Sequence, residues 1–196
     1  MSSNKSVVLG SAPQVDLSPL LAQVTVPADV AEAAQSQLVE VFREGIATLP
    51  HPLCTASIWL ACKEAWPHTD DDFEGLHFIN LAIQAHHSFT QALPGGLIGE
   101  VAVRPGTLFH TNPLCLHWLS PSDQVRNGLA PATGYIGLQW EVPFHEAEER
   151  FNWLVAELGK HALFASLYQD ERPVFVTPEG DYSGAAPGHG IASAAA

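Results

Sequence analysis

The stretch that decides the fold of this chain is Trp66-Pro67-His68-Thr69-Asp70, which lies in the first half of the 196 residues. In an extended strand, successive side chains alternate between the two faces, so the imidazole of His68 and the carboxylate of Asp70 project to the same side. An imidazole and a carboxylate side by side are half of a metal site. One more imidazole from a neighbouring strand would complete a set of three ligands.

A histidine in a suitable place follows in the second half of the chain. His117 lies 49 residues after His68, behind a Pro105-Gly106 turn and an apolar run. Two histidines and one carboxylate form a facial set that leaves coordination positions open, which is typical of non-haem Fe(II). His110 competes for the third position. On one uninterrupted strand His110 and His117 would face opposite ways, but Asn112-Pro113 favours a turn between them.

The composition is that of an ordinary globular protein, with 46% hydrophobic and 15% charged residues. No apolar stretch is long enough to span a membrane, and the N-terminus lacks the apolar centre of a signal peptide. Cys54, Cys62 and Cys115 form no Cys-x-x-Cys pair, which fits reduced thiols. We therefore expect a cytoplasmic protein without a membrane partner.

The charge balance is strongly acidic, because eight Lys and Arg stand against 21 Asp and Glu, giving a net charge of −13. No two of the cationic residues are adjacent in the sequence. Binding to a phosphate backbone needs clustered cations, so nucleic acid is not an expected partner. A local cationic pocket for a small anion stays compatible with this balance.

The pattern along the chain predicts a mainly β domain with flanking helices. Residues 1–28 lack sustained periodicity and are expected to form an irregular arm, and the tail 177–196, rich in Gly, Ala, Ser and Pro, is expected to be flexible. Between them, Asp29 is a candidate cap for a helix that ends near Gly45. Apolar or alternating runs predict strands at 55–62, 76–85, 98–104 and 134–142, and an apolar stripe predicts a helix at 146–168. Short strands between Pro and Gly turns favour a sandwich or a barrel.

The ordered combination of His68-x-Asp70, the Pro105-Gly106 turn, His117 and Pro121 resembles the 2-oxoglutarate and Fe(II)-dependent oxygenase superfamily over residues 55–143. The resemblance implies a double-stranded β-helix, a jelly roll of cupin-like type, as the core of a single domain at 29–176. It also implies that His68, Asp70 and His117 hold Fe(II). The implied reaction couples oxidative decarboxylation of 2-oxoglutarate to succinate with hydroxylation of a C–H bond in a small molecule or an amino-acid side chain.

An oxygenase of this family also needs a cation for the far carboxylate of 2-oxoglutarate, because a buried carboxylate without a partner is penalised. Family members often carry this cation about ten residues past the distal histidine, and Arg126 lies nine residues past His117. Lys63 and Arg104 are the alternatives, since the other cations fall in the arm, on the expected helices or after them.

Two other functions remain open at this point. The first is a cupin-like metalloenzyme that uses no 2-oxoglutarate, and the second is a non-catalytic jelly-roll binding module. An arginine would be natural at the start of the last predicted strand, where the chain has Gly134-Tyr135, and its absence fits the first alternative. The sequence indicates neither the substrate nor the oligomeric state.

Several other histidines and tryptophans belong to the predicted strands or their ends. His77, His86 and His87 are expected to be structural or pocket residues. Trp66 and Trp118 are expected in the core, or at the mouth of a cavity because Trp118 lies next to His117 and Trp66 next to Pro67.

Overall fold

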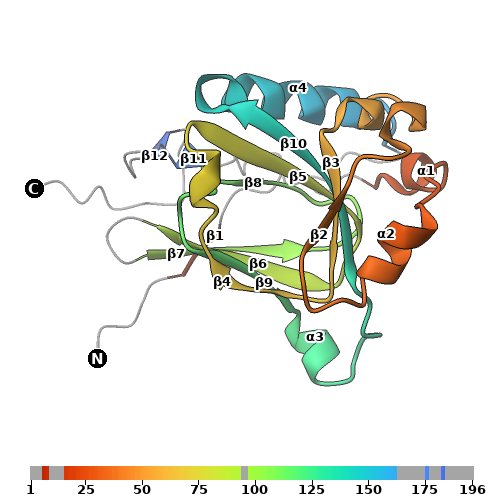
Figure 1. Cartoon of the computed structure of the whole chain (residues 1–196), viewed down its shortest axis with the longest axis horizontal. Coiled ribbons are helices and arrows are strands. Elements are labelled where there is room, and N and C mark those ends of the chain that lie inside the picture. The colour runs from red at the N-terminus through yellow and green to blue at the C-terminus, as the bar shows by residue number, and fades with distance from the viewer. Residues whose placement is uncertain (1–5, 9–15, 94–96, 163–174, 177–181, 184–196) are drawn as a thin grey trace, which may run out of the picture.

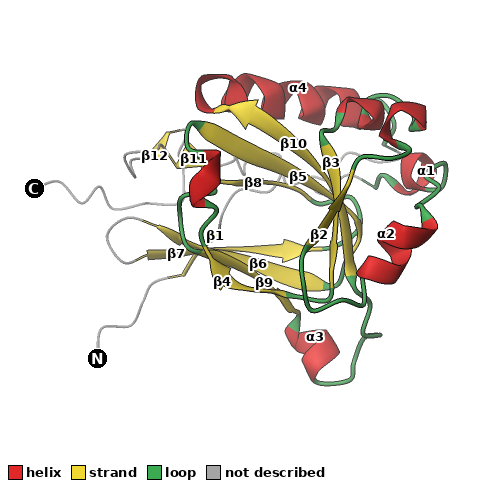
Figure 2. Ribbon diagram, in the orientation of Figure 1, coloured by secondary structure: helices red, strands yellow, loops and turns green. Residues whose placement is uncertain are grey.

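Two sheets lie face to face and form the body of the protein, with helix α4 (Ala147–Gly159) on the outer side of one of them (Figure 1). The structure is a computed structural model, and it describes residues 6–8, 16–93, 97–162, 175–176 and 182–183. Strands dominate the described part, and the helices lie around them (Figure 2). The predicted class, mainly β with flanking helices, is confirmed.

The first sheet has the strand order β1-β7-β6-β9-β4, and the second has the order β2-β3-β10-β5-β8. The first comprises β1 (Ser6–Val8), β4 (Ala65–His68), β6 (His87–Leu93), β7 (Leu97–Val103) and β9 (His117–Pro121). The second comprises β2 (Glu40–Phe42), β3 (Ile58–Cys62), β5 (Leu76–Gln84), β8 (Leu108–Thr111) and β10 (Tyr135–Pro143). A separate pair consists of β11 (Phe175–Val176) and β12 (Tyr182–Ser183).

Four strand pairs are nested in the sequence, with β6 and β7 as the innermost pair and β3 and β10 as the outermost. Strand β6 pairs with β7, β5 with β8, β4 with β9 and β3 with β10, and all four pairs are antiparallel. The chain from β3 to β10 therefore follows the path of one long hairpin. This hairpin is wound so that β10 also pairs with β5, and β9 with β6. The winding brings β4 next to β9, although some fifty residues separate them.

The second sheet is covered on both faces, which follows from the alternation of side chains along its strands. On β10, Leu138 and Trp140 belong to the core that lies under α4 (Ala147–Gly159). Tyr135 and Gln139 lie on the opposite face, toward the first sheet, and line a cavity between the sheets. One face of β10 therefore stabilises the fold and the other contributes to the cavity.

Helix α4 confirms the predicted C-terminal helix as far as Gly159. Its buried residues Phe151, Leu154 and Leu158 form the predicted apolar stripe. Burying each of these side chains contributes about 1.5–3 kcal/mol to the free energy of unfolding. Residues 160–162 are not helical, and 163–168 lie outside the described residues.

The predicted helix at 29–45 is wrong beyond its first turns. Helix α2 covers Ala28–Ala33, and β2 (Glu40–Phe42) pairs with the edge of β3. The hydroxyl of Ser36 accepts a hydrogen bond from the backbone N–H of Leu38 at 3.1 Å, which favours a turn here. The β-branched residues that follow gain ladder hydrogen bonds from β3, so tertiary pairing outweighs the local helix propensity.

The ends of the chain differ from the expected arm and tail. Within 1–28 the structure has β1, which pairs in parallel with β7, and helix α1 (Ser18–Leu21). Leu17 and Leu20 are buried in the core, so this segment is not an irregular arm throughout. The tail 177–196 lies outside the described residues except for Tyr182–Ser183.

The remaining helices are short. Helix α3 covers Asp123–Arg126, and 3-10 helices cover Ile46–Thr48, Leu53–Thr55, Asp71–Phe73 and Phe144–Glu146. The predicted turn at Pro105-Gly106 is present, and Gly106 adopts a φ of 86°, which favours glycine. Among the described helices, none has the length and apolar character needed to cross a membrane.

Candidate metal centre and cavity

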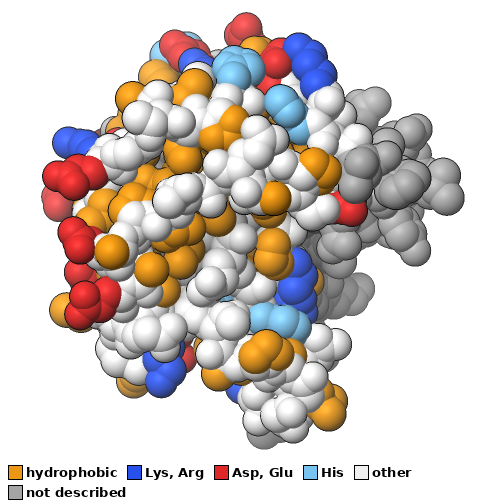
Figure 3. Space-filling view, turned by 90° about the vertical axis from the view of Figure 1, so that its right-hand side faces the viewer, with side chains coloured by type: hydrophobic (Ala, Val, Ile, Leu, Met, Phe, Trp, Pro, Cys, Tyr) orange, Lys and Arg blue, Asp and Glu red, His pale blue; other side chains and the backbone are white. Residues whose placement is uncertain are grey.

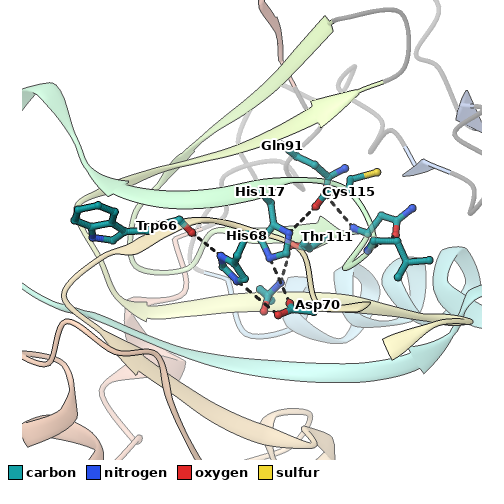
Figure 4. Close-up of polar contacts among 10 residues, drawn as sticks. Trp66, His68, Asp70, Gln91, Thr111, Cys115 and His117 are labelled. Atoms are coloured by element: carbon teal, nitrogen blue, oxygen red, sulfur yellow. Dashed lines mark hydrogen bonds and ion pairs between the residues drawn. The ribbon is translucent and has the colours of Figure 1, made fainter. Parts of the chain in front are cut away.

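The structure brings His68, Asp70 and His117 together at the adjacent ends of β4 and β9. His68 and His117 are direct cross-strand partners, with ring centroids 4.4 Å apart. Nε2 of His68 lies 3.6 Å from Oδ1 of Asp70, and Nε2 of His117 lies 3.4 Å from Oδ2 (Figure 4). One ligand atom from each residue falls within 4.8 Å of the others, so the group could hold a metal ion.

Each imidazole is oriented by a hydrogen bond to a backbone carbonyl two residues earlier. Nδ1 of His68 donates to the carbonyl oxygen of Trp66 at 2.6 Å, and Nδ1 of His117 donates to that of Cys115 at 2.8 Å. A carbonyl only accepts, so Nδ1 carries a proton, and Nε2 is the nitrogen that faces Asp70 and that a metal ion would bind in place of a proton. Outer hydrogen bonds of this kind are typical of metal-bound histidines.

A backbone hydrogen bond fixes the position of Asp70, and the neighbouring histidines favour its ionised form. Its N–H donates to the carbonyl oxygen of Pro113 at 2.8 Å, which ties the loop after β4 to the segment before β9. Burial raises the pKa of Asp70, but the hydrogen bond and charge of His117, with the charge of His68, outweigh it and hold the pKa below its usual value. Asp70 is therefore an anion, the form that binds a cation.

His110, the competing candidate, lies elsewhere. It is buried on β8, and its Nε2 contacts Nδ1 of His77 on the neighbouring strand β5. Burial lowers the pKa of both residues, that of His77 to about 4. His77 also packs against Phe144, with ring centroids 4.7 Å apart. His77 is thus a structural residue of the second sheet, as expected for it from the sequence.

We expect the buried His77 to make the protein sensitive to acid. Its folded-state pKa lies below the usual 6.5, so from pH 6.5 to about 4 the unfolded chain binds a proton that the native protein does not. Stability therefore falls over this range. In His77→Phe the fall should be smaller, by up to about 1.4 kcal/mol per pH unit, as measured by urea unfolding. The control is His145→Gln, which changes an exposed histidine. If the free energy of unfolding of His77→Phe fell with pH as steeply as that of the wild type, native His77 would be protonated over this range.

A cavity of about 1040 Å³ lies between the two sheets and includes the three candidate ligands in its wall. Most of the wall is apolar, with Phe78, Phe89 and Phe109 from three different strands. Pockets of this size and character are the usual binding sites for small molecules. Trp66 and Trp118 line it too, so of their two expected places, the core and the cavity, the structure favours the cavity.

Exposed hydrophobic side chains form part of the cavity rim. Leu38 is 73% exposed, Val41 60% and Trp66 69%, and Val39 is 44% exposed. Large apolar side chains in water are unfavourable, and their grouping at one opening is typical of a ligand site. On the side of α1 and α2, several acidic side chains lie along one edge of the molecule (Figure 3).

The structure does not bring Arg126 to this cavity. Arg126 lies at the end of α3, its side chain is 55% exposed, and its guanidinium pairs with Asp123 at 2.5 Å. Arg104 donates to the carbonyl oxygens of His87 and Val103. Neither arginine lines the cavity, nor does Lys63.

Arg43 is the only cationic side chain among the described residues that line the cavity. It follows β2, and no salt bridge joins it to another described residue. The expected helix at 29–45 had placed Arg43 away from the site. Its position becomes evident only once that segment is known to pair with β3.

Sequence reasoning also missed the polar residues of the inner face. Asn80, Thr111, Tyr135 and Gln139 are buried and line the cavity, and all four lie on predominantly apolar strands. Gln91 faces His117 across β6 and β9, and its side-chain oxygen accepts from the N–H of Asn112 at 3.0 Å. The available signal was a polar residue inside an apolar strand, since such a residue needs a partner when buried.

No protein-family model matches this chain, and the search of curated proteins finds no match.

Proposed function

We propose that this protein is a non-haem Fe(II) oxygenase that uses 2-oxoglutarate to hydroxylate a C–H bond of a small molecule or an amino-acid side chain. The observation that carries the proposal is the group formed by His68, Asp70 and His117, with both Nε2 atoms and an anionic carboxylate at one point of the cavity wall. Two imidazoles and one carboxylate with open positions form the facial set typical of non-haem Fe(II) oxygenases.

The strand arrangement supports the same proposal. The nested pairs from β3·β10 inward to β6·β7, in two facing sheets, are what a jelly roll produces when a long hairpin is wound into a sandwich. Cupins share this architecture. The candidate ligands stand on β4 and β9, which are neighbours only because of the winding.

The residues have separate tasks in the proposed reaction. His68, Asp70 and His117 hold the iron, and the carbonyls of Trp66 and Cys115 keep the proton on Nδ1 of each histidine. The bound iron supplies the activation of oxygen. The apolar walls exclude water and position the C–H bond of the substrate.

We further propose that Arg43 binds the far carboxylate of 2-oxoglutarate, the task expected of Arg126 from the sequence. A carboxylate in a largely apolar cavity needs a cationic partner, and Arg43 is the one that the described cavity wall offers. A guanidinium binds a carboxylate through two parallel hydrogen bonds.

Anaerobic titration with Fe(II) and then 2-oxoglutarate tests the proposal through the visible charge-transfer band of the chelate. We expect a band in the wild type and a requirement for at least about 10-fold more 2-oxoglutarate in Arg43→Ala, because a charge-assisted hydrogen bond contributes about 1.5–3 kcal/mol. Arg126→Ala is the matched control and should behave like the wild type. If only Arg126→Ala required more 2-oxoglutarate, Arg126 and not Arg43 would be the partner of the far carboxylate.

A second candidate is a metalloenzyme that binds its substrate at the iron and uses no 2-oxoglutarate. The cavity-lining residues on β5, β8 and β10 include no cation that could pair with the far carboxylate of 2-oxoglutarate, and this favours the second candidate. Iron binding without a band at any 2-oxoglutarate concentration would establish this candidate over the first. Failure to bind iron would contradict both and leave a non-catalytic binding module.

A further inference from the structure

Two buried polar atoms on the inner face of the second sheet have no hydrogen-bond partner among the described residues. They are Oδ1 of Asn80 and the hydroxyl oxygen of Tyr135, in side chains of residues that are 4% and 3% exposed. Both residues line the cavity. An unsatisfied buried polar group costs about 1–3 kcal/mol, so native proteins rarely retain one without a reason. A ligand in the cavity supplies such a reason.

The position of the Tyr135 hydroxyl depends on Gly137. A Cβ at Gly137 would lie 2.1 Å from this hydroxyl oxygen, so the phenol ring folds back along β10 over the glycine. Burial raises the pKa of Tyr135 far above its usual value. Tyr135 therefore remains a neutral phenol, which can both donate and accept a hydrogen bond.

Asn80 connects this region to the metal centre. Its Nδ2 donates to the hydroxyl of Thr111 at 3.2 Å, and Asn80 lies opposite Gln139 on β10. Asn112, the residue after Thr111, donates to Gln91, the register partner of His117. Thr111 and the candidate ligands appear together in the close-up of Figure 4. The polar region and the metal centre thus belong to one cavity.

The chemistry of this region selects a neutral ligand group. Asn80, Thr111, Gln139 and Tyr135 are all uncharged, so a carboxylate among them would lack a cation and be penalised. A hydrocarbon would leave both polar atoms unsatisfied. A carboxamide carries a donor and an acceptor, so it complements the Asn80 amide in either of its orientations.

We propose that Asn80 and Tyr135 form a binding subsite for an uncharged carboxamide group whose aromatic or aliphatic body lies against the phenylalanine walls of the cavity. Binding at this subsite does not require the metal. Its identification as the substrate subsite rests on the proposed function. The walls that would hold the body include Phe78, Phe89 and Phe109.

Three probes with one body and different head groups test the subsite. They are 2-naphthamide, 2-naphthoate and 2-methylnaphthalene, titrated into the iron-free full-length Arg43→Ala protein, so that the proposed carboxylate partner is absent, and followed by naphthalene fluorescence. We expect 2-naphthamide to bind at least about 10-fold more tightly than the other two. If 2-naphthoate bound most tightly, the site would be an anion site and the proposal would be wrong. If all three probes bound equally, the head group would contribute nothing and the cavity would bind only the apolar body, which would also contradict the proposal.

Tyr135→Phe separates a binding role from a structural one. The variant should bind 2-naphthamide about 3- to 10-fold more weakly, with 2-methylnaphthalene unchanged. Its thermal stability without ligand should equal or exceed that of the wild type, because an unsatisfied hydroxyl is removed. Wild-type affinity for 2-naphthamide in this variant would overturn the role of Tyr135.

Thr55→Val is the matched control. The hydroxyl of Thr55 accepts a hydrogen bond from the indole of the buried Trp140 at 2.9 Å, and Thr55 is not a cavity residue. We expect lower stability and unchanged probe binding, the opposite of Tyr135→Phe. All these titrations are free of iron, so their failure is distinct from a failure of the iron and 2-oxoglutarate titration.

Discussion

We expect Asp70→Asn to lose Fe(II) affinity by more than about 100-fold, beyond the 10- to 100-fold typical of changes to outer partners of metal ligands. The amide keeps the size of the side chain but removes the only anionic ligand, leaving two neutral imidazoles. The fold should persist, because the tie of this loop to Pro113 uses the backbone N–H of residue 70. Anaerobic calorimetry measures the affinity, and circular dichroism checks the fold.

The neighbouring Asp72→Asn is the control for this prediction. Asp72 is exposed in the same acidic segment and carries the same charge, so both variants lower the net negative charge by one. Asp72→Asn should bind Fe(II) like the wild type. Equal losses in the two variants would mean that the acidic loop attracts cations only by its charge, which contradicts a ligand role for Asp70.

We expect Gly134→Ala to lower the free energy of unfolding by at least about 3 kcal/mol, the upper range of overpacking changes. A Cβ at this position would lie 1.8 Å from the carbonyl oxygen of Ala34 and 2.6 Å from its carbonyl carbon. These are backbone atoms at the end of α2, next to the buried Ala33, so no side-chain rotation relieves the overlap. For a chain of this size, a melting temperature lower by about 6–12 °C is expected in calorimetry.

Gly159→Ala shows the effect of the same added methyl group where there is space. Nothing lies within 4 Å of a Cβ at Gly159, which belongs to α4. Because alanine favours helix more than glycine, stability should rise by about 0.5–1 kcal/mol. A wild-type melting temperature in Gly134→Ala would show that α2 does not pack against the start of β10 in solution.

The strands were largely predictable because their signal is local. Alternation and β-branched residues within 76–85 and 98–104 indicated strands that the structure has as β5 and β7. The order of His68, Asp70 and His117 indicated the group that the structure brings within ligand distance. The spacing of His68 and Asp70 needs no tertiary information, since both belong to one short extended segment.

The helix expected at 29–45 shows where local reasoning ends. Its second half mixes helix formers with Val39, Val41 and Phe42, which favour strands, and the open edge of β3 offers these residues ladder hydrogen bonds. This one difference also changed the site, because Arg43 moved from an expected helix surface to the cavity wall. Arg126 lies as near to His117 in sequence as expected, but α3 directs it toward Asp123.

The sequence by itself determined the mainly β character, the C-terminal helix and the three residues of the candidate metal centre, because these depend on periodicity and on residue chemistry. Only the tertiary structure decided which side chains share the cavity. Asn80 and Tyr135 come from β5 and β10, whose neighbours are set by the winding of the nested hairpin, and Arg43 follows β2, which pairs with β3. Such pairings link segments far apart in the chain, and their free energy comes from burial and ladder hydrogen bonds that no local pattern encodes.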